Sequence, residues 1–159
     1  MWREAIGALK GVADCIAPDL RGFGRAGAAL EPILTMEQHA DDAAALLDSL
    51  GVLQAHVVGL SMGGYAALAF AERHAARLAS LILVDTRAAD DGDEGRARRS
   101  AAADRVLEVG RGVFAREMLA KLVAPNAGRD VRARLLSMME ATPYETLVAA
   151  LLGMQARPD

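Results

Sequence analysis

Apolar residues fall into runs of two kinds along the chain, and the two kinds alternate. Three runs are nearly continuous, and we expect strands there: 12–18 (VADCIAP), 56–60 (HVVGL) and 80–84 (SLILV). Such runs are typical of parallel strands that helices cover on both faces. Between them, apolar residues recur at helical spacing. Alternating strands and helices predict the α/β class with a parallel sheet and flanking helices.

The clearest predicted helix spans residues 36–50. Thr35 and Gln38 have the spacing of a capping box at its start, and Gly51 follows its end. The residues expected to line its apolar face are Met36, Ala40, Ala43, Leu47 and Leu50. A shorter helix is predicted from Trp2 to Leu9.

The composition changes after Val84. Residues 89–103 are charged and lack apolar periodicity, which predicts a solvated linker. Residues 104–159 regain helical spacing, and Thr142, Pro143 and Glu145 predict a capping box with proline in the first helical turn. We therefore expect a core at 1–88, the linker, and a helical cap segment at 104–159.

The sequence GLSMGG at 59–64 stands between the predicted strand 56–60 and an apolar helix. A serine in a tight strand-to-helix turn with glycines on both sides is typical of a nucleophile elbow. Ser61 is therefore the candidate nucleophile. The backbone N–H of Met62, at the start of the helix, is the candidate oxyanion donor, and its side chain lines a pocket or simply packs.

Two further motifs flank this turn: IAPDLRGFGR at 16–25 and RLASLILVDT at 77–86. Together with the elbow they resemble the α/β-hydrolase superfamily, in its single-domain esterase, lactonase and perhydrolase-like branch. The superfamily's serine after this Arg-Gly-x-Gly motif is Ala26 here. The resemblance implies a partial α/β-hydrolase sheet, because the His-Gly loop and the catalytic Asp and His of that family have no counterpart in this chain.

Three histidines are alternatives for the base. His56 is five residues before Ser61 on a strand, roughly 16 Å away, and His74 is thirteen residues along a helix, roughly 19 Å away. In the family the catalytic histidine follows the nucleophile along the chain, whereas His39 precedes Ser61. A solvated or helix-capping role is therefore the alternative to catalysis for His39. We expect the triad acid and base to lie outside this chain.

Two aspartates are alternatives for the acid. Asp85 ends the strand after the elbow, where some members of the superfamily carry their acid, although a structural role in the turn with Thr86 competes. Asp19 corresponds to a structural loop residue of the family. No His, Cys, Asp or Glu cluster has metal-ligand spacing, and GFGRAG at 22–27 lacks the setting of a nucleotide fingerprint, so no metal and no cofactor are expected.

The resemblance implies a serine hydrolase that cleaves a small ester, lactone or thioester through an acyl-enzyme on Ser61. The alternative is a truncated, non-catalytic remnant that acts in binding or association. Whether the cap helices cover the nucleophile or form a packing layer stays open. In the family a further strand lies between those seen here at 12–18 and 56–60, so these two would not pair. We expect either that the sheet shifts until the two strands meet or that their free edges cause self-association.

Composition narrows the expected partners and compartment. The net charge of −3, with no basic face, argues against nucleic acid. No apolar run of about 18 residues occurs, so no membrane span is expected. The lone Cys15 cannot form an internal disulfide and suits a reducing compartment, so we expect a cytoplasmic protein that acts on a small molecule.

Overall fold

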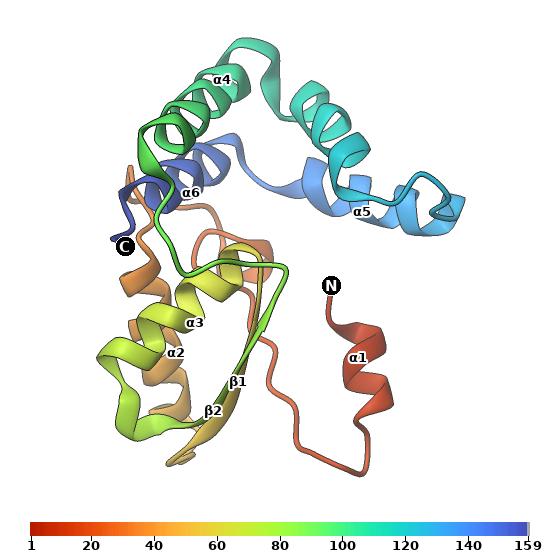
Figure 1. Ribbon diagram of the computed structural model, residues 1–159. Helices are drawn as coiled ribbons and strands as arrows, with labels where there is room; N and C mark the ends of the chain where they lie inside the picture. The colour runs from red at the N-terminus through yellow and green to blue at the C-terminus, as the bar shows by residue number, and fades with distance from the viewer. Residues whose placement is uncertain (159) are drawn as a thin grey trace.

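The computed structural model describes residues 1–158 as a small parallel sheet with helices packed beside and above it (Figure 1). The elements follow in the order α1 (Arg3–Ala8), η1 (Gly24–Ala26), α2 (Met36–Ser49), β1 (Ala55–Leu60), α3 (Met62–Arg73), η2 (Ala75–Arg77), β2 (Leu78–Val84), α4 (Gly92–Leu122), α5 (Arg129–Ala141) and α6 (Tyr144–Ala156). This arrangement confirms the α/β class.

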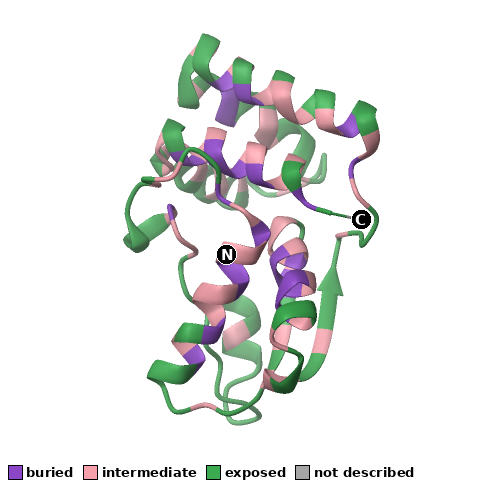
Figure 2. Ribbon diagram, turned by 90° about the vertical axis from the view of Figure 1, so that its left-hand side faces the viewer, coloured by how far each residue is buried: buried purple, intermediate pink, exposed green. Residues whose placement is uncertain are grey.

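The sheet consists of β1 and β2, which pair in parallel with Leu60 opposite Val84. The helices α2 and α3 pack on each other and on one face of this sheet, where Met36, Ala40, Leu47 and Phe70 form the buried centre of the core. Val58 and Ile82 lie opposite each other on the strands and remain 44% and 49% exposed. Figure 2 shows the strand arrow largely in the exposed colour. The core is therefore built on one side of the sheet.

The helix start predicted at Thr35 is confirmed. The Thr35 hydroxyl accepts from the Gln38 N–H at 3.2 Å, and the Gln38 side chain accepts from the Thr35 N–H at 2.9 Å. The short N-terminal helix is also present, and Gly11 follows it with φ +84°. Local capping and periodicity were sufficient to locate both helices.

The strand expected at 12–18 does not form. Residues 13–20 have no regular structure, and Val12 and Ile16 are 80% and 48% exposed. A strand is stabilised by the hydrogen bonds of a ladder, and within residues 1–158 the sheet pairs only β1 with β2. The apolar pattern is present but a neighbouring strand is not, so this segment stays extended and unpaired.

The downstream part differs from the expected linker and cap in two places. Residues 92–103, expected within a linker, form the first turns of α4, where Arg98 and Glu94 make an i,i+4 ion pair. Gly110, at φ +74°, kinks this helix. The capping box expected at Thr142 is absent, because Pro143 occupies the N-cap of α6 and the Thr142 hydroxyl donates to the Met138 carbonyl of α5.

Helix α6 joins the downstream helices to the rest of the chain. It packs along α4, and its Ala149 carbonyl accepts from the Leu34 N–H at 3.0 Å. The buried Thr146 hydroxyl donates to the Gly22 carbonyl at 2.8 Å and accepts from the Ala29 N–H at 3.0 Å. These bonds hold α6 on the loop between residues 20 and 35. None of the helices within residues 1–158 has the length and hydropathy needed to cross a bilayer.

A buried carboxylate at the start of α4 also ties the downstream helices together. Asp91 accepts from Arg87 at 2.5 Å, from Arg99 at 2.9 Å and from Arg157 at 3.3 Å. Burial by itself raises the pKa of Asp91, but the hydrogen bonds from Arg99 and Arg87 outweigh it and lower the pKa to about 2. The ionised form is therefore the one that the fold stabilises.

This depressed pKa predicts a loss of stability in acid. The stabilisation by Asp91 is fully present above the unfolded-state pKa of 3.8 and is lost as the pH falls from there through about 2. We expect Asp91 to contribute about 2 kcal/mol to the loss in free energy of urea unfolding from pH 6 to pH 2. Asp91→Asn should reduce the pH dependence by this amount, whereas Asp93→Asn, at a fully exposed carboxylate, should leave it unchanged. Equal slopes in Asp91→Asn and the parent chain would refute the assignment.

Candidate active site

Ser61 lies at the junction where β1 ends and α3 begins. Its backbone has φ 51° and ψ −117°, a conformation that non-glycine residues rarely adopt. Its N–H donates to the Val84 carbonyl at 3.0 Å, and its carbonyl accepts from the Gly64 N–H at 2.8 Å and the Thr86 hydroxyl at 2.9 Å. The residue is exposed. The predicted strained, accessible strand-to-helix turn is therefore present.

Two glycines make this turn possible because other chain segments pass too close for a side chain. A Cβ on Gly59 would lie 2.3 Å from the Gly63 carbonyl oxygen. A Cβ on Gly64 would lie 2.5 Å from the Thr86 side chain. Gly59 thus lets the end of β1 approach the start of α3, and Gly64 lets α3 approach the loop after β2. Both contacts fix the position of Ser61.

The start of α3 supplies the electrostatic part of the site. The first N–H groups of a helix have no acceptor within the helix and lie at the positive end of its dipole. The Met62 N–H is the first of these, directly after Ser61. The Met62 side chain is half-buried and packs against the core cluster around Phe70, so packing is the role that the structure shows for it.

Two of the three histidines are engaged at the opposite end of the sheet from Ser61. His56, near the start of β1, hydrogen-bonds the Ser80 hydroxyl at 2.7 Å. His74, after the last residue of α3, hydrogen-bonds Asp41 at 2.8 Å, and Arg73 pairs with the same carboxylate at 2.8 Å. These contacts tie α2 to α3 and β1 to β2. The structure places neither imidazole beside the nucleophile.

His39 is buried in the first turn of α2, with 1% of its surface exposed. Both ring nitrogens are closed off from solvent and have no hydrogen-bond partner within the described residues. Burial lowers the pKa of His39, opposed by the nearby Asp42 carboxylate and assisted by the Arg21 charge. The His39 side chain lines the cavity between residues 18–21 and α2, but its ring nitrogens are closed off, so the imidazole does not serve as a base in this arrangement. The solvated role also expected for it is wrong.

The two candidate acids have different surroundings. Asp85 directly follows β2, as Ser61 directly follows β1, and the last residues of the two strands, Leu60 and Val84, pair with each other. Asp85 has φ 44° and is exposed. None of the three histidines, all within the described residues, is hydrogen-bonded to it. Asp19 accepts from the Arg25 N–H at 3.0 Å, and this hydrogen bond lowers its pKa. Asp19 therefore has the structural loop role that was expected.

Arg21 in the same loop anchors the loop to α2. Its guanidinium donates to Asp42 at 2.8 and 2.5 Å and to Glu31 at 2.5 Å. The hydrogen bonds from Arg21 lower the pKa of both carboxylates. The Arg-Gly-x-Gly motif at 21–24 thus holds the loop that α6 packs on, and its arginine is structural.

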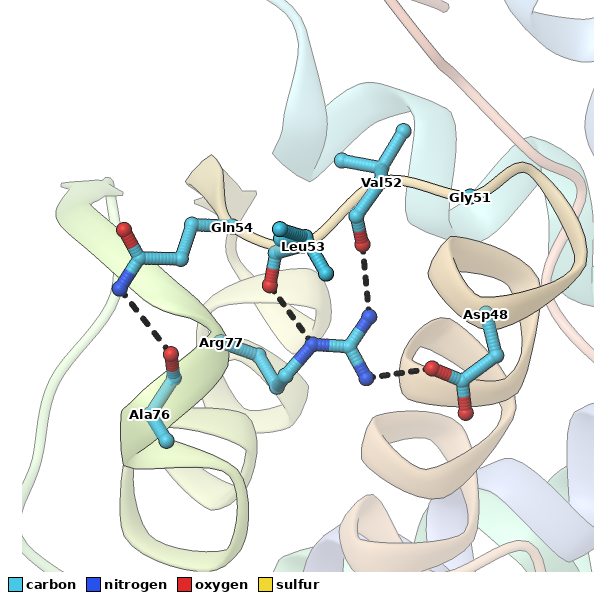
Figure 3. Close-up of a pocket in the computed structure, with 7 residues that line it drawn as sticks. All are labelled: Asp48, Gly51, Val52, Leu53, Gln54, Ala76 and Arg77. Atoms are coloured by element: carbon cyan, nitrogen blue, oxygen red, sulfur yellow. Dashed lines mark hydrogen bonds and ion pairs between the residues drawn. The ribbon is translucent and has the colours of Figure 1, made fainter.

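Two of the cavities that open to solvent within residues 1–158 lie away from the elbow, and Ser61 lines neither of them. The larger, of about 560 Å³, lies at the N-terminal end of β1 (Figure 3). There Arg77 donates to the Val52 and Leu53 carbonyls and to Asp48, and Gln54 donates to the Ala76 carbonyl. These polar groups form hydrogen bonds with one another, so the residues around this cavity have a structural role. The second, of about 330 Å³, lies between Pro18–Arg21 and α2.

An exposed serine on a strained turn between a parallel strand and a helix, held by close-approach glycines, is typical of the α/β hydrolase fold. The α/β hydrolase fold family model matches residues 1–120, and the chain belongs to this family.

Solved structures extend this likeness to nearly the whole chain. A thermophilic esterase from Thermogutta terrifontis, solved with malate bound, is 40% identical and matches 99% of this chain and 59% of its own, with a TM-score of 0.92. The enol-lactonase from Burkholderia xenovorans LB400 is 27% identical and matches 98% of this chain and 59% of its own, with a TM-score of 0.83.

Among curated proteins, the 2-hydroxymuconate semialdehyde hydrolase of Pseudomonas sp. strain CF600 is 37% identical over 83 residues, which are 52% of this chain and 29% of that protein. The chain thus spans about three-fifths of the solved relatives and under a third of this curated one. The chain belongs to a family that contains hydrolases. Because it matches only part of the length of these relatives, their activity is stated for this chain only as a proposal.

Proposed function

We propose that this chain carries the nucleophile of a serine hydrolase that cleaves a small ester, lactone or thioester. The observation that carries the proposal is the backbone of Ser61, φ 51° on an exposed turn at the N-terminus of α3. Strained backbone at an exposed polar residue is characteristic of functional sites. The likeness to an esterase at 40% identity supports the ester-like substrate class.

The chemistry proceeds in two steps. The Ser61 hydroxyl oxygen attacks the substrate carbonyl carbon while a base takes its proton, and the Met62 N–H donates to the oxyanion that forms. Collapse of this intermediate expels the alcohol, enol or thiol, which takes up the proton, and leaves an ester on Ser61. Water then attacks this ester by the same route and releases the acid. The described histidines lie away from Ser61 or are closed off, so the chain alone supplies the nucleophile and the oxyanion donor without a base.

A non-catalytic role in binding or association is the second candidate. The observation that favours it is that each of the three histidines is engaged or enclosed elsewhere in the fold.

The test is hydrolysis of p-nitrophenyl acetate by the purified chain. We expect feeble turnover, about 10³-fold or more below that of a complete triad, because the Ser61 hydroxyl has to attack without a base in this chain to take its proton. Ser61→Ala should abolish this remainder and also labelling by a fluorophosphonate, read by intact mass. Ser49→Ala, at an exposed serine that ends α2, is the matched control.

Two outcomes would change the conclusion. Unchanged turnover and labelling in Ser61→Ala would refute the nucleophile and leave the binding role. Robust turnover that Ser61→Ala abolishes would show that the chain has its own base, and Asp85→Asn and His39→Gln would then identify the groups involved.

A further inference from the structure

The ion cluster around Asp91 extends to the helix that begins after Ser61. Arg157, which follows α6, donates to the Ala88 carbonyl at 3.0 Å, to the Ala89 carbonyl and to Asp91. The central carbon of its guanidinium lies 4.0 Å from the centroid of the Tyr65 ring. Residues separated by more than sixty positions along the chain therefore meet at one arginine.

Tyr65 connects this cluster to the elbow. It is in the first turn of α3, and its N–H donates to the Ser61 carbonyl at 3.4 Å. The Met154 side chain of α6 packs against the same core cluster as Tyr65 and Met62. Arg157, directly after α6, thus touches the first turn of α3 through the Tyr65 ring, and Met154 of α6 packs on the core cluster that this turn also covers.

The central pair of the cluster is removed from solvent. The side chains of Arg157 and Asp91 are 4% and 2% exposed. A buried ion pair adds little net stability compared with an apolar pair of the same volume. Removing one partner is nevertheless destabilising, because it leaves the other charge buried without a partner. Asp91 retains Arg87 and Arg99 if Arg157 is lost, whereas Asp91 is the carboxylate that Arg157 contacts, beside two backbone carbonyls. Such a pair fixes one arrangement of the elements that it joins.

We propose that Asp91, Arg157 and Tyr65 form a latch, in which Asp91 and Arg157 are positioning residues that hold α4 and α6 against the first turn of α3 and thereby set access to Ser61. The latch acts through the Tyr65 ring and does not touch the substrate. Its effect on hydrolysis rests on the proposed function, but its effect on access to position 61 does not.

The test uses a thiol as the probe at position 61. In a Cys15→Ser, Ser61→Cys chain, the one thiol reports access by its rate of reaction with Ellman's reagent under native conditions. We expect Arg157→Met and Tyr65→Leu each to change this rate about fivefold, the size of one partly exposed cation–π contact. Tyr65→Phe keeps the ring, loses only the hydroxyl that Arg87 contacts, and should keep the rate. Arg132→Met removes an arginine that also donates to backbone carbonyls, at the α4–α5 turn, and should have no effect.

A comparison with stability separates positioning from a merely structural role. Asp91→Asn strands the Arg157 charge and should lower the urea midpoint more than Arg157→Met does. The double variant Asp91→Asn/Arg157→Met should recover most of that midpoint while its thiol rate stays changed, because the contact with Tyr65 is still missing. A thiol rate that follows the urea midpoint in every variant, or that does not change in Arg157→Met and Tyr65→Leu, would overturn the latch.

The two proposals can fail separately. If Ser61→Ala leaves ester hydrolysis unchanged, the nucleophile is refuted and the thiol rates still decide the latch. If the thiol rates refute the latch, hydrolysis through Ser61 is unaffected as a proposal.

Discussion

Gly153→Ala is expected to lower the free energy of unfolding by about 4 kcal/mol or more, among the largest effects of any single substitution in this chain. A Cβ on Gly153 would lie 1.6 Å from the Leu34 carbonyl oxygen and 2.5 Å from its carbon. Backbone atoms cannot yield as a flexible side chain can, so α6 has to move away from the loop that it packs on. That movement also breaks the bond from the Leu34 N–H to the Ala149 carbonyl.

The same substitution at a second helical glycine provides the control. A Cβ on Gly7, inside α1, would meet nothing within 4 Å, and alanine is the better helix former there. Urea unfolding followed by circular dichroism at 222 nm should show a large loss for Gly153→Ala and no loss for Gly7→Ala. Similar midpoints for the two variants would mean that α6 does not dock as described.

Local signals in the sequence were sufficient for the helix starts and for the elbow. The capping box at Thr35 and Gln38 fixes the start of α2, because both of its hydrogen bonds lie within four residues. Gly59, Ser61 and Gly63 predict a turn in which the backbone strain and the close approach of Gly59 to the Gly63 carbonyl are also local. These features depend on neighbours along the chain, so the sequence pattern contains them.

The errors occurred where structure depends on distant partners. Residues 12–18 have a strand pattern, but a strand needs a ladder, and the pattern does not reveal whether a neighbouring strand is present. The charged stretch 92–103 lacks apolar periodicity, yet it is helical because ion pairs and the packing of α4 on α6 stabilise it. Arg157 and Asp91 are 66 residues apart, so no pattern of neighbouring residues indicates that their side chains are in contact.

The free sheet edge leads to the second large effect, which we propose as self-association of the isolated chain. The sheet has not rearranged to pair residues 13–18 with β1, so of the two outcomes considered from the sequence, association is the one that remains. A strand at an edge presents unpaired N–H and C=O groups, and here the exposed Val58 and Ile82 add an apolar face. A second copy can cover both.

Size-exclusion chromatography with light scattering measures this association over a range of concentrations. We expect dimers or larger species, and we expect Val58→Lys to shift the chain to monomer, because a charge on an edge strand opposes pairing. Leu122→Lys, at a 65% exposed leucine that ends α4 away from the sheet, should leave the oligomers unchanged. A monomer at all concentrations, with one cooperative urea transition, would show that the chain tolerates its free edge, and equal dissociation by both lysines would place the interface elsewhere.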